Sequence, residues 1–209
     1  SGDFYWWSKV DDQFVAAVAD CTGHGVPGAL MSMLGISFLR EIVLKEHQTM
    51  PDQILNQLRS EIITALDQSM ELGRQRDGLD IAIFTINPEN DQLYYAGARN
   101  PLLIIRQGEL IELKADKAPV SVYLKMKSFN MQQIQLQKGD QVYLFTDGYP
   151  DQFGGDKGQK FKRGHFKNLL LQLSGQPMEL QFRVLKEKFH EWKGNYEQID
   201  DITVLGIKI

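Results

Sequence analysis

The sequence has little cysteine, no signal peptide and no long hydrophobic run. Cys21 is the single cysteine among 209 residues, so no disulfide can form within the chain, which fits a reducing compartment. No uninterrupted apolar run reaches the roughly 18 residues of a membrane span, and the N-terminus lacks a signal-peptide pattern. We therefore expect a cytoplasmic domain that makes no direct membrane contact. This expectation is compatible with a membrane tether elsewhere in the full-length protein.

A strong charge of either sign is also missing. The 23 Lys and Arg residues against 27 Asp and Glu residues give a net charge of −4, which does not favour a nucleic-acid binder. With 43% hydrophobic residues and no internal repeat, we expect residues 1–209 to form a single domain. Because the motif-bearing strand begins already at Asp3, we expect this domain to be the C-terminal part of a longer protein with upstream sensor domains.

The stretch Ala17–Gly28 organises the chain. A strand of small and β-branched residues runs into Asp20, crosses a glycine-rich turn and opens a helix at Pro27. Residues 23–28 also fit the dinucleotide pattern G-x-G-x-x-G. That pattern needs a second parallel strand ending in an acidic residue, whereas here the helical pattern continues to Glu46 and a second helix begins at Pro51. A nucleotide-binding oxidoreductase is therefore the weaker interpretation.

Two strand-like runs at the N-terminus predict a β-hairpin. They span residues 3–10 and 13–20, and only Asp11 and Asp12 separate them. If Val10 faces Gln13, the register places Asp3 directly opposite Asp20. Like charges in that arrangement are destabilising, and a cation between them would reverse the sign.

The rest of the chain predicts a mixed α+β domain. The helix at residues 27–46 is apolar over most of its circumference, so we expect burial on more than one side, and the next helix should span residues 51–72. The period then changes to that of strands, of which the first four form an antiparallel meander. The expected strands are residues 79–87, 92–97, 102–106, 109–113, 129–136, 141–146 and 202–209, with helices at residues 161–173 and 178–192.

Four aspartates, Asp3, Asp20, Asp147 and Asp200, each stand at the end of a predicted strand. If the strands beside Asp147 and Asp200 are antiparallel neighbours, both carboxylates lie at one sheet edge. Clustered carboxylates repel one another, but hard oxygen ligands are what Mg²⁺ and Mn²⁺ prefer. Two such ions can bridge a water, lower its pKa and neutralise a phosphoryl group. This chemistry indicates hydrolysis without a covalent enzyme intermediate, and Cys21 beside Asp20 does not suit a cysteine phosphatase.

Four segments resemble the acidic motifs of the metal-dependent PPM (protein phosphatase 2C) Ser/Thr phosphatases, and most closely the SpoIIE-type bacterial branch. They are residues 1–6, residues 20–25, Asp147-Gly148 and residues 200–203; residues 96–101 also fit. The resemblance covers nearly the whole chain. It implies two packed antiparallel β-sheets flanked by helices, an α-β-β-α sandwich with two metal ions at one edge.

The resemblance also implies roles for individual residues. Asp20 would bridge both ions, Asp3 and the main-chain carbonyl of Cys21 would hold the second, and Asp147 with Asp200 would hold the first. The family usually has glycine where Cys21 stands, and the first residue of the Asp200-Asp201 pair is the better match to the family ligand. His24 is either a proton donor to the leaving alkoxide or a loop-shaping residue.

Other residues keep two interpretations. Arg99 and Asn100 either contact phosphate or form a turn, and Asp80 either supports a further metal or only begins its strand. A run of basic residues between positions 157 and 167 either steers an acidic phosphoprotein to the site or forms a solvated face. This last group consists of Lys157, Lys160, Lys162, Arg163 and Lys167.

The expected function is a Mn²⁺- or Mg²⁺-dependent protein phosphatase that acts on phosphoserine or phosphothreonine by attack of a metal-bridging water. The resemblance implies a STAS-type anti-sigma-factor antagonist as substrate in bacterial signalling. It also implies control, or formation of a homodimer, through the helices within residues 27–72. The alternative is a catalytically inactive phosphatase-like module that only binds a regulatory protein.

Overall fold

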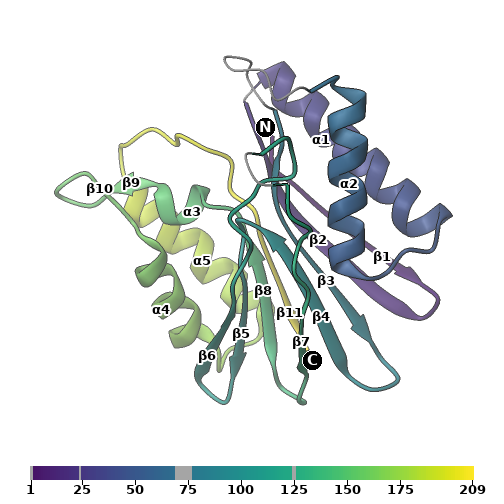
Figure 1. The fold of residues 1–209 in the computed structure, drawn as a ribbon. Coiled ribbons are helices and arrows are strands. Elements are labelled where there is room, and N and C mark those ends of the chain that lie inside the picture. The colour runs from purple at the N-terminus through teal and green to yellow at the C-terminus, as the bar shows by residue number, and fades with distance from the viewer. Residues whose placement is uncertain (1, 24, 69–76, 124–125) are drawn as a thin grey trace.

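Two antiparallel β-sheets lie face to face between two pairs of helices (Figure 1). A computed structural model describes residues 2–23, 25–68, 77–123 and 126–209. The first sheet has the order β1-β2-β3-β4-β7, with β1 Phe4–Val10, β2 Gln13–Cys21, β3 Leu79–Asn87, β4 Gln92–Ala98 and β7 Gln132–Gln135. The second has the order β11-β8-β5-β6, with β5 Leu102–Arg106, β6 Glu109–Leu113, β8 Gln141–Phe145 and β11 Val204–Lys208. The predicted α-β-β-α sandwich is confirmed.

Helices cover both outer faces. On the first sheet lie α1 Gly25–Arg40, the π-helical continuation η1 Glu41–Lys45 and α2 Pro51–Ala65; on the second lie α4 Arg163–Leu173 and α5 Met178–Lys193. The short helix α3 Gly148–Asp151 and the small hairpin of β9 Phe153–Gly154 and β10 Gln159–Lys160 connect β8 to α4. Neither α3 nor this hairpin was predicted, because each is too short to leave a periodic pattern.

Side-chain alternation along the strands builds three hydrophobic layers. On β2, Ala17 and Ala19 pack toward α1 and α2, whereas Ala16 and Val18 point between the sheets. On β8, Val142 and Leu144 complete the layer between the sheets, and the alternate residues pack against α4 and α5. The middle layer ends where the strands reach their acidic residues.

The N-terminal hairpin has the predicted register. Val10 pairs with Gln13, and the ladder continues to Phe4 opposite Ala19, so Asp3 and Asp20 follow as the next pair of positions. Asp11 and Asp12 both have left-handed backbone angles, with φ of 48° and 63°, as a two-residue turn with φ above zero at both positions requires.

Three predictions about the elements are wrong. The four strands do not form one meander, because the chain crosses from the first sheet to the second after Ala98, where Arg99 has a φ of 62°. The strand expected at residues 129–136 is paired only over Gln132–Gln135. Helix α2 ends at Ala65 and not near Leu72, because Asp67 has a φ of 47°; residues 69–76 lie outside the described part of the chain.

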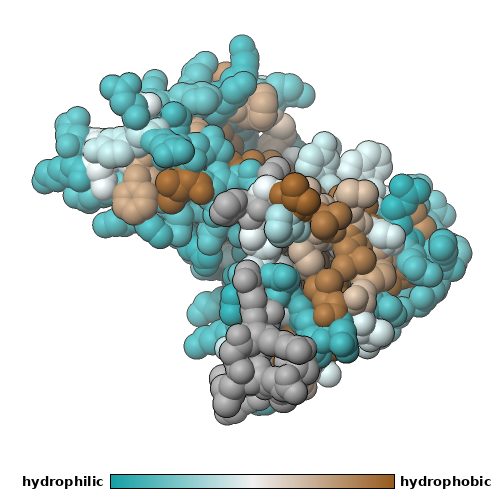
Figure 2. Space-filling view, turned by 90° about the horizontal axis from the view of Figure 1, so that it is seen from above, coloured by the Kyte–Doolittle hydropathy of each residue, from teal (hydrophilic) through white to brown (hydrophobic). Residues whose placement is uncertain are grey.

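Helix α1 is buried along one face, whereas the sequence predicted burial on more than one side. Its buried positions are Gly28, Met31, Gly35 and Leu39. Val26, Leu30 and Met33 are 73%, 60% and 70% exposed. Figure 2 shows hydrophobic side chains gathered on the side of the molecule that carries α1 and α2. The continuous helix Gly25–Lys45 is long and apolar enough to cross a membrane. This is weak evidence for a membrane span, because the same helix packs on the first sheet.

Candidate active site

Carboxylates from three separate parts of the chain meet at one end of the sandwich. Oxygen atoms of Asp20, Asp147 and Asp200 all lie within 4.8 Å of one another. Asp20 stands near the end of β2, Asp147 follows β8 and Asp200 precedes β11. Because β8 and β11 are antiparallel neighbours, with Val204 opposite Phe145, the residues after one strand and before the other share an edge.

The pleat of the first sheet directs further carboxylates to the same place. Asp20 continues the even-numbered row of β2 that points between the sheets, and Asp80 on β3 lies directly opposite it. Asp3 follows in register with Asp20 on the other side. The hydrophobic layer between the sheets therefore ends in a row of acidic side chains.

Thr146 joins the two sheets at this edge. Its hydroxyl donates to Asp3 Oδ2 at 2.6 Å, and its Oγ1 accepts from the Thr203 N–H at 3.1 Å. The Thr146 N–H in turn donates to the Thr203 carbonyl at 3.0 Å. Thr146 is buried and was not singled out from the sequence, since a threonine at the end of an apolar strand carries no local signal.

Asp200 and Asp201 have different surroundings. Asp200 belongs to the carboxylate group, whereas Asp201 Oδ2 accepts from the Gly2 N–H at 2.6 Å. The backbone carbonyl of Asp201 packs so closely on Gly148 that a Cβ there would overlap it. The glycine after Asp147 therefore lets the segment before β11 approach the end of β8.

Burial and mutual repulsion raise the pKa values of several carboxyl groups in this cluster. Desolvation, followed by the charges of Asp3, Asp147 and Asp200, raises the pKa of Asp20 to about 8. Desolvation is also the main cause that raises the pKa of Asp3 to about 6, against the hydrogen bond from Thr146. The pKa values of Asp80 and Asp147 are raised as well, again first by desolvation. At neutral pH Asp20 therefore keeps its proton more readily than an ordinary aspartate, and a cation bound there would replace it.

The donor set fits a hard divalent cation. Carboxylate oxygens are the preferred ligands of Mg²⁺ and Mn²⁺, and here three of them approach one another closely enough to share an ion. The raised pKa of Asp20 shows that the site gains when positive charge enters it. Asp20, Asp147 and Asp200 are thus the residues best placed to hold metal, with Asp3 beside them.

The structure describes Cys21 but not His24. Cys21 is buried at the end of β2, and desolvation raises the pKa of its thiol to about 12, so a reactive thiolate is excluded. Its φ is not left-handed, so a side chain is tolerated where the family has glycine. That its carbonyl holds metal stays a prediction. His24 lies outside the described residues.

The glycine-rich turn is explained by close packing. A Cβ on Gly28 would come within 2.5 Å of the Gly23 carbonyl oxygen, and the Gly2 Cα lies nearby. The Ser32 hydroxyl on α1 lies 2.6 Å from the Gly2 carbonyl oxygen and 2.9 Å from that of Gly28, so its single hydrogen is shared between these two acceptors. Among the described strands every pairing within the sheets is antiparallel, so the dinucleotide interpretation has no βαβ unit to stand on.

Arg99 and Asn100 support Asp80 from the neighbouring strand end. Arg99 Nη1 lies 3.5 Å from both Asp80 oxygens, and the Asn100 side-chain amide donates to the Asp80 carbonyl at 2.9 Å. Asn100 is buried, so its role here is structural. Two members of the basic run are paired: Lys160 with Asp151 at 2.7 Å and Lys167 with Glu112 at 2.8 Å.

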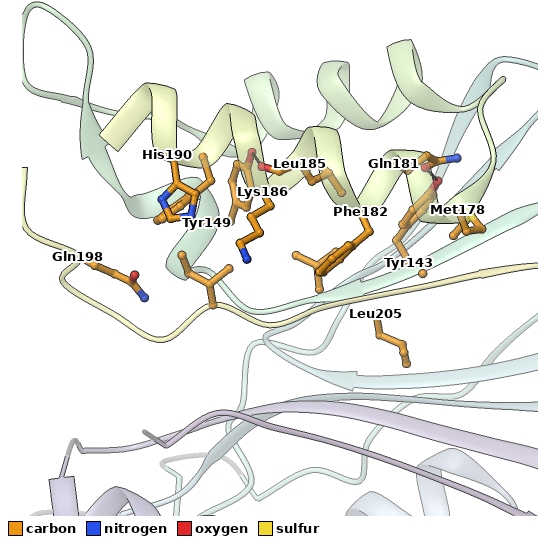
Figure 3. Close-up of a pocket in the computed structure, with 14 residues that line it drawn as sticks. Tyr143, Tyr149, Met178, Gln181, Phe182, Leu185, Lys186, His190, Gln198 and Leu205 are labelled. Carbon is orange, nitrogen blue, oxygen red and sulfur yellow. Dashed lines mark hydrogen bonds between the residues drawn. The ribbon is translucent and has the colours of Figure 1, made fainter. Parts of the chain in front are cut away.

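A cavity of about 520 Å³ lies apart from the acidic edge, between α5 and β11 (Figure 3). Its lining is mostly apolar, with Tyr143, Phe182 and Leu185 from β8 and α5, and none of the clustered aspartates lines it. The carboxylate cluster and this cavity are therefore separate features of the molecule.

Comparison with known proteins agrees with the geometry. The family described as Stage II sporulation protein E (SpoIIE) matches residues 10–209. The chain belongs to the SpoIIE family. Its fold is that of a PP2C phosphatase domain, as the resemblance of its motifs implied.

Individual SpoIIE-family members and neighbours support the same assignment. The chain is 29% identical over 154 residues to the phosphoserine phosphatase RsbU of Bacillus subtilis, covering 71% of this chain and 42% of RsbU. It thus spans less than half the length of that relative. The SiaA-PP2C domain of Pseudomonas aeruginosa superposes with a TM-score of 0.88 at 29% identity, over 100% of this chain and 80% of that one. The SpoIIE phosphatase domain of B. subtilis with a regulatory fragment gives 0.75 at 20% identity, over 100% and 57%.

Proposed function

We propose that this domain hydrolyses phosphoserine or phosphothreonine in a regulatory protein, with two Mn²⁺ or Mg²⁺ ions held by its acidic edge. The observation that carries the proposal is the convergence of Asp20, Asp147 and Asp200 at one strand edge, with Asp3 and Asp80 in register beside Asp20. Metal dependence is general in the PPM family. The number and kind of the ions are part of the proposal.

When bound, two divalent ions would lower the pKa of a water and neutralise charge on the phosphoryl group. We assign Asp20 to both ions, Asp147 and Asp200 to one of them, and Asp3 with the Cys21 carbonyl to the other. Thr146 fixes the Asp3 carboxylate, and Gly148 keeps Asp200 close to Asp147. We assign proton donation to the leaving alkoxide to His24, whose placement the structure does not describe.

The substrate we propose is a phosphorylated STAS-type anti-sigma-factor antagonist in a bacterial signalling pathway. Two things support it: membership of the SpoIIE family and the similarity to RsbU, which is named a phosphoserine phosphatase. A cytoplasmic location follows from this substrate and is part of the same proposal, as is a longer protein with upstream regulatory domains.

The alternative is a non-catalytic module that binds a regulatory protein. A module without catalysis has no physical reason to keep a cluster whose members raise one another's pKa. Hydrolysis of para-nitrophenyl phosphate and of a phosphoserine STAS protein, each with Mn²⁺ and with EDTA, separates the two. We expect Mn²⁺-dependent turnover that Asp20→Asn abolishes while the fold is retained. Absence of turnover on both substrates in a folded chain would favour the binding module, and turnover that persists in EDTA would contradict the proposed metal mechanism.

We further propose that the exposed apolar face of α1 contacts a second copy of the chain. Val26, Leu30 and Met33 stand at helical spacing on this face, and their exposure has no use within the domain. α1 also carries Ser32, which holds Gly2 beside Asp3, so movement of the helix would reach the metal ligands. Leu30→Glu should abolish any concentration-dependent association seen in sedimentation, whereas unchanged association would exclude this face.

A further inference from the structure

A basic hollow lies beside the acidic edge, with a volume of about 400 Å³. Four of its lining residues are cationic and come from three parts of the chain: Arg99, Lys114, Lys117 and Arg163. Two carboxylates, Glu112 and Asp116, also line it. The sequence showed only a run of basic residues near Arg163, since Arg99 and the two lysines stand at distant positions.

Both carboxylates of the hollow are engaged away from its cations. Glu112 Oε2 accepts from Lys167 Nζ at 2.8 Å. The two oxygens of Asp116 accept from the backbone and side-chain nitrogens of Asn130, both at 2.7 Å.

The cations themselves are short of partners. Within the described residues, no carboxylate forms an ion pair with Lys114, Lys117 or Arg163. Arg99 lies 3.5 Å from the Asp80 carboxylate, and its Nε donates to the Lys117 carbonyl at 3.3 Å. The three unpaired cations are exposed, so the hollow presents positive charge to solvent.

The strand register places the hollow next to the carboxylate cluster. Asp20 is opposite Asp80, and Ile81 is opposite Ala98, so Arg99 follows at the same end of the next strand. Two strand spacings give roughly 10 Å between Asp20 and Arg99. The segment of Lys114 and Lys117 is fixed there by Asp116, whose carbonyl accepts from the Arg99 N–H and whose N–H donates to the Gly97 carbonyl, each at 2.8 Å.

Arg163, at the start of α4, approaches from the other sheet. It lines the same hollow as Arg99, whose guanidinium lies 3.5 Å from the Asp80 carboxylate, so it stands near the acidic edge. Cations from both halves of the sandwich therefore flank the hollow: Arg99 at the end of a strand of the first sheet, and Arg163 on a helix that covers the second.

We propose that Arg99, Lys114, Lys117 and Arg163 bind an acidic side chain of the substrate, two or three residues from the phosphoserine. An extended peptide advances about 3.3 Å per residue, so a phosphoserine at the acidic edge carries its second or third neighbour about 7 to 10 Å away, over these cations. This proposal rests on the proposed function, since it takes the phosphoserine to lie at the metal ligands.

The test uses fluorescent peptides that carry the non-hydrolysable phosphonate analogue of phosphoserine, with Glu or with Gln at the second and third positions on both sides. Fluorescence anisotropy, measured while the protein is titrated into each peptide with Mn²⁺ at low salt, gives the affinity for the Glu peptide and for the Gln peptide. The ratio of these two affinities is the quantity compared. We expect the Glu peptide to bind the native chain about three- to tenfold more tightly, as two or three exposed charge pairs allow. Arg163→Gln and the double variant Lys114→Gln/Lys117→Gln should each bring this ratio toward one.

The matched control is Lys138→Gln, which removes the same charge from an exposed turn before β8, at the end of that strand remote from Asp147. The Lys138→Gln variant should show the same ratio of affinities for the Glu and Gln peptides as the native chain. Equal affinity of the native chain for both peptides, or a preference that survives in both hollow variants, would overturn the proposal. Turnover of the matching phosphoserine peptides with Mn²⁺ is measured in parallel: an acidic preference in binding without turnover of either peptide supports the hollow and contradicts the phosphatase assignment.

Discussion

Asp80 on β3 lies directly opposite Asp20 on β2, so two carboxylates share the rung of the first sheet next to its last pair, Cys21 and Leu79. Directly opposed like charges destabilise a sheet. The chain offsets this pair only partly, through the 3.5 Å contact between Asp80 and Arg99. Bound protons or bound cations must supply the rest, and pH decides which of the two is present.

Without metal, the domain should lose stability as pH rises. The pKa of Asp20 is raised to about 8 in the folded chain and that of Asp3 to about 6, so the native state binds more protons than the unfolded state above about pH 4. The slope of stability with pH is then negative from about pH 4 to about pH 8. In EDTA we expect Tm to fall by several degrees over this window, and Mn²⁺ to raise Tm more at pH 8 than at pH 5.

Asp20→Asn is the control for this pH dependence. Its Tm in EDTA should vary less with pH, because the group with the largest shift no longer titrates. A native Tm that rises with pH in EDTA, or a Mn²⁺ effect equal at both pH values, would contradict the electrostatic account.

Gly148→Ala should damage the site more than the fold. A Cβ at this position meets the Asp201 carbonyl, so the segment that carries Asp200 must move away from Asp147. We expect a loss of about 1–3 kcal/mol in unfolding free energy together with a large loss of Mn²⁺ affinity. Gly164→Ala, a surface position of α4 with nothing within 4 Å of the added Cβ, should raise the unfolding free energy by up to about 1 kcal/mol and leave the Mn²⁺ affinity unchanged. Native metal affinity in the Gly148 variant would show that this close approach does not position Asp200.

Thr146→Val tests the hydroxyl that holds Asp3. Removal of the donor leaves Asp3 Oδ2 without its 2.6 Å hydrogen bond and frees the Thr203 N–H. Loss of such a supporting contact typically weakens metal binding about tenfold or more. Thr85→Val removes another buried 2.6 Å hydrogen bond, to the Thr49 carbonyl, and should lower stability without changing Mn²⁺ affinity. Equal metal affinities in the two variants would exclude a special role for Thr146.

The hairpin and the strand ends could be read from the sequence because their signals are local. Two adjacent residues with left-handed φ, Asp11 and Asp12, fixed the register, and that register alone brought Asp3 to Asp20. The shared edge of Asp147 and Asp200 needed only the assumption of antiparallel neighbours, which β8 and β11 satisfy. The family resemblance then supplied the sandwich.

Contacts between distant segments could not be read in this way. Nothing near Thr146 in the sequence shows that it bonds Asp3, 143 positions away, and nothing near Lys114 shows that it lies close to Arg163. The crossing after Ala98 was missed because β4 and β5 have the same strand pattern whether they pair or lie in different sheets. The amphipathic face of α1 was misjudged because glycines, and not large apolar residues, make its closest contacts.

Mn²⁺ binding measured by titration calorimetry tests most directly whether the clustered aspartates form a cation site. Asp91→Asn is the matched control, since Asp91 lies in the β3–β4 turn, away from Asp20, and its φ of 52° suits asparagine. We predict that the native chain and the Asp91 variant bind Mn²⁺ alike, with proton release, and that Asp20→Asn weakens binding at least about 100-fold. Equal Mn²⁺ affinity in the native chain and Asp20→Asn, or no binding in a folded native chain, would contradict the account.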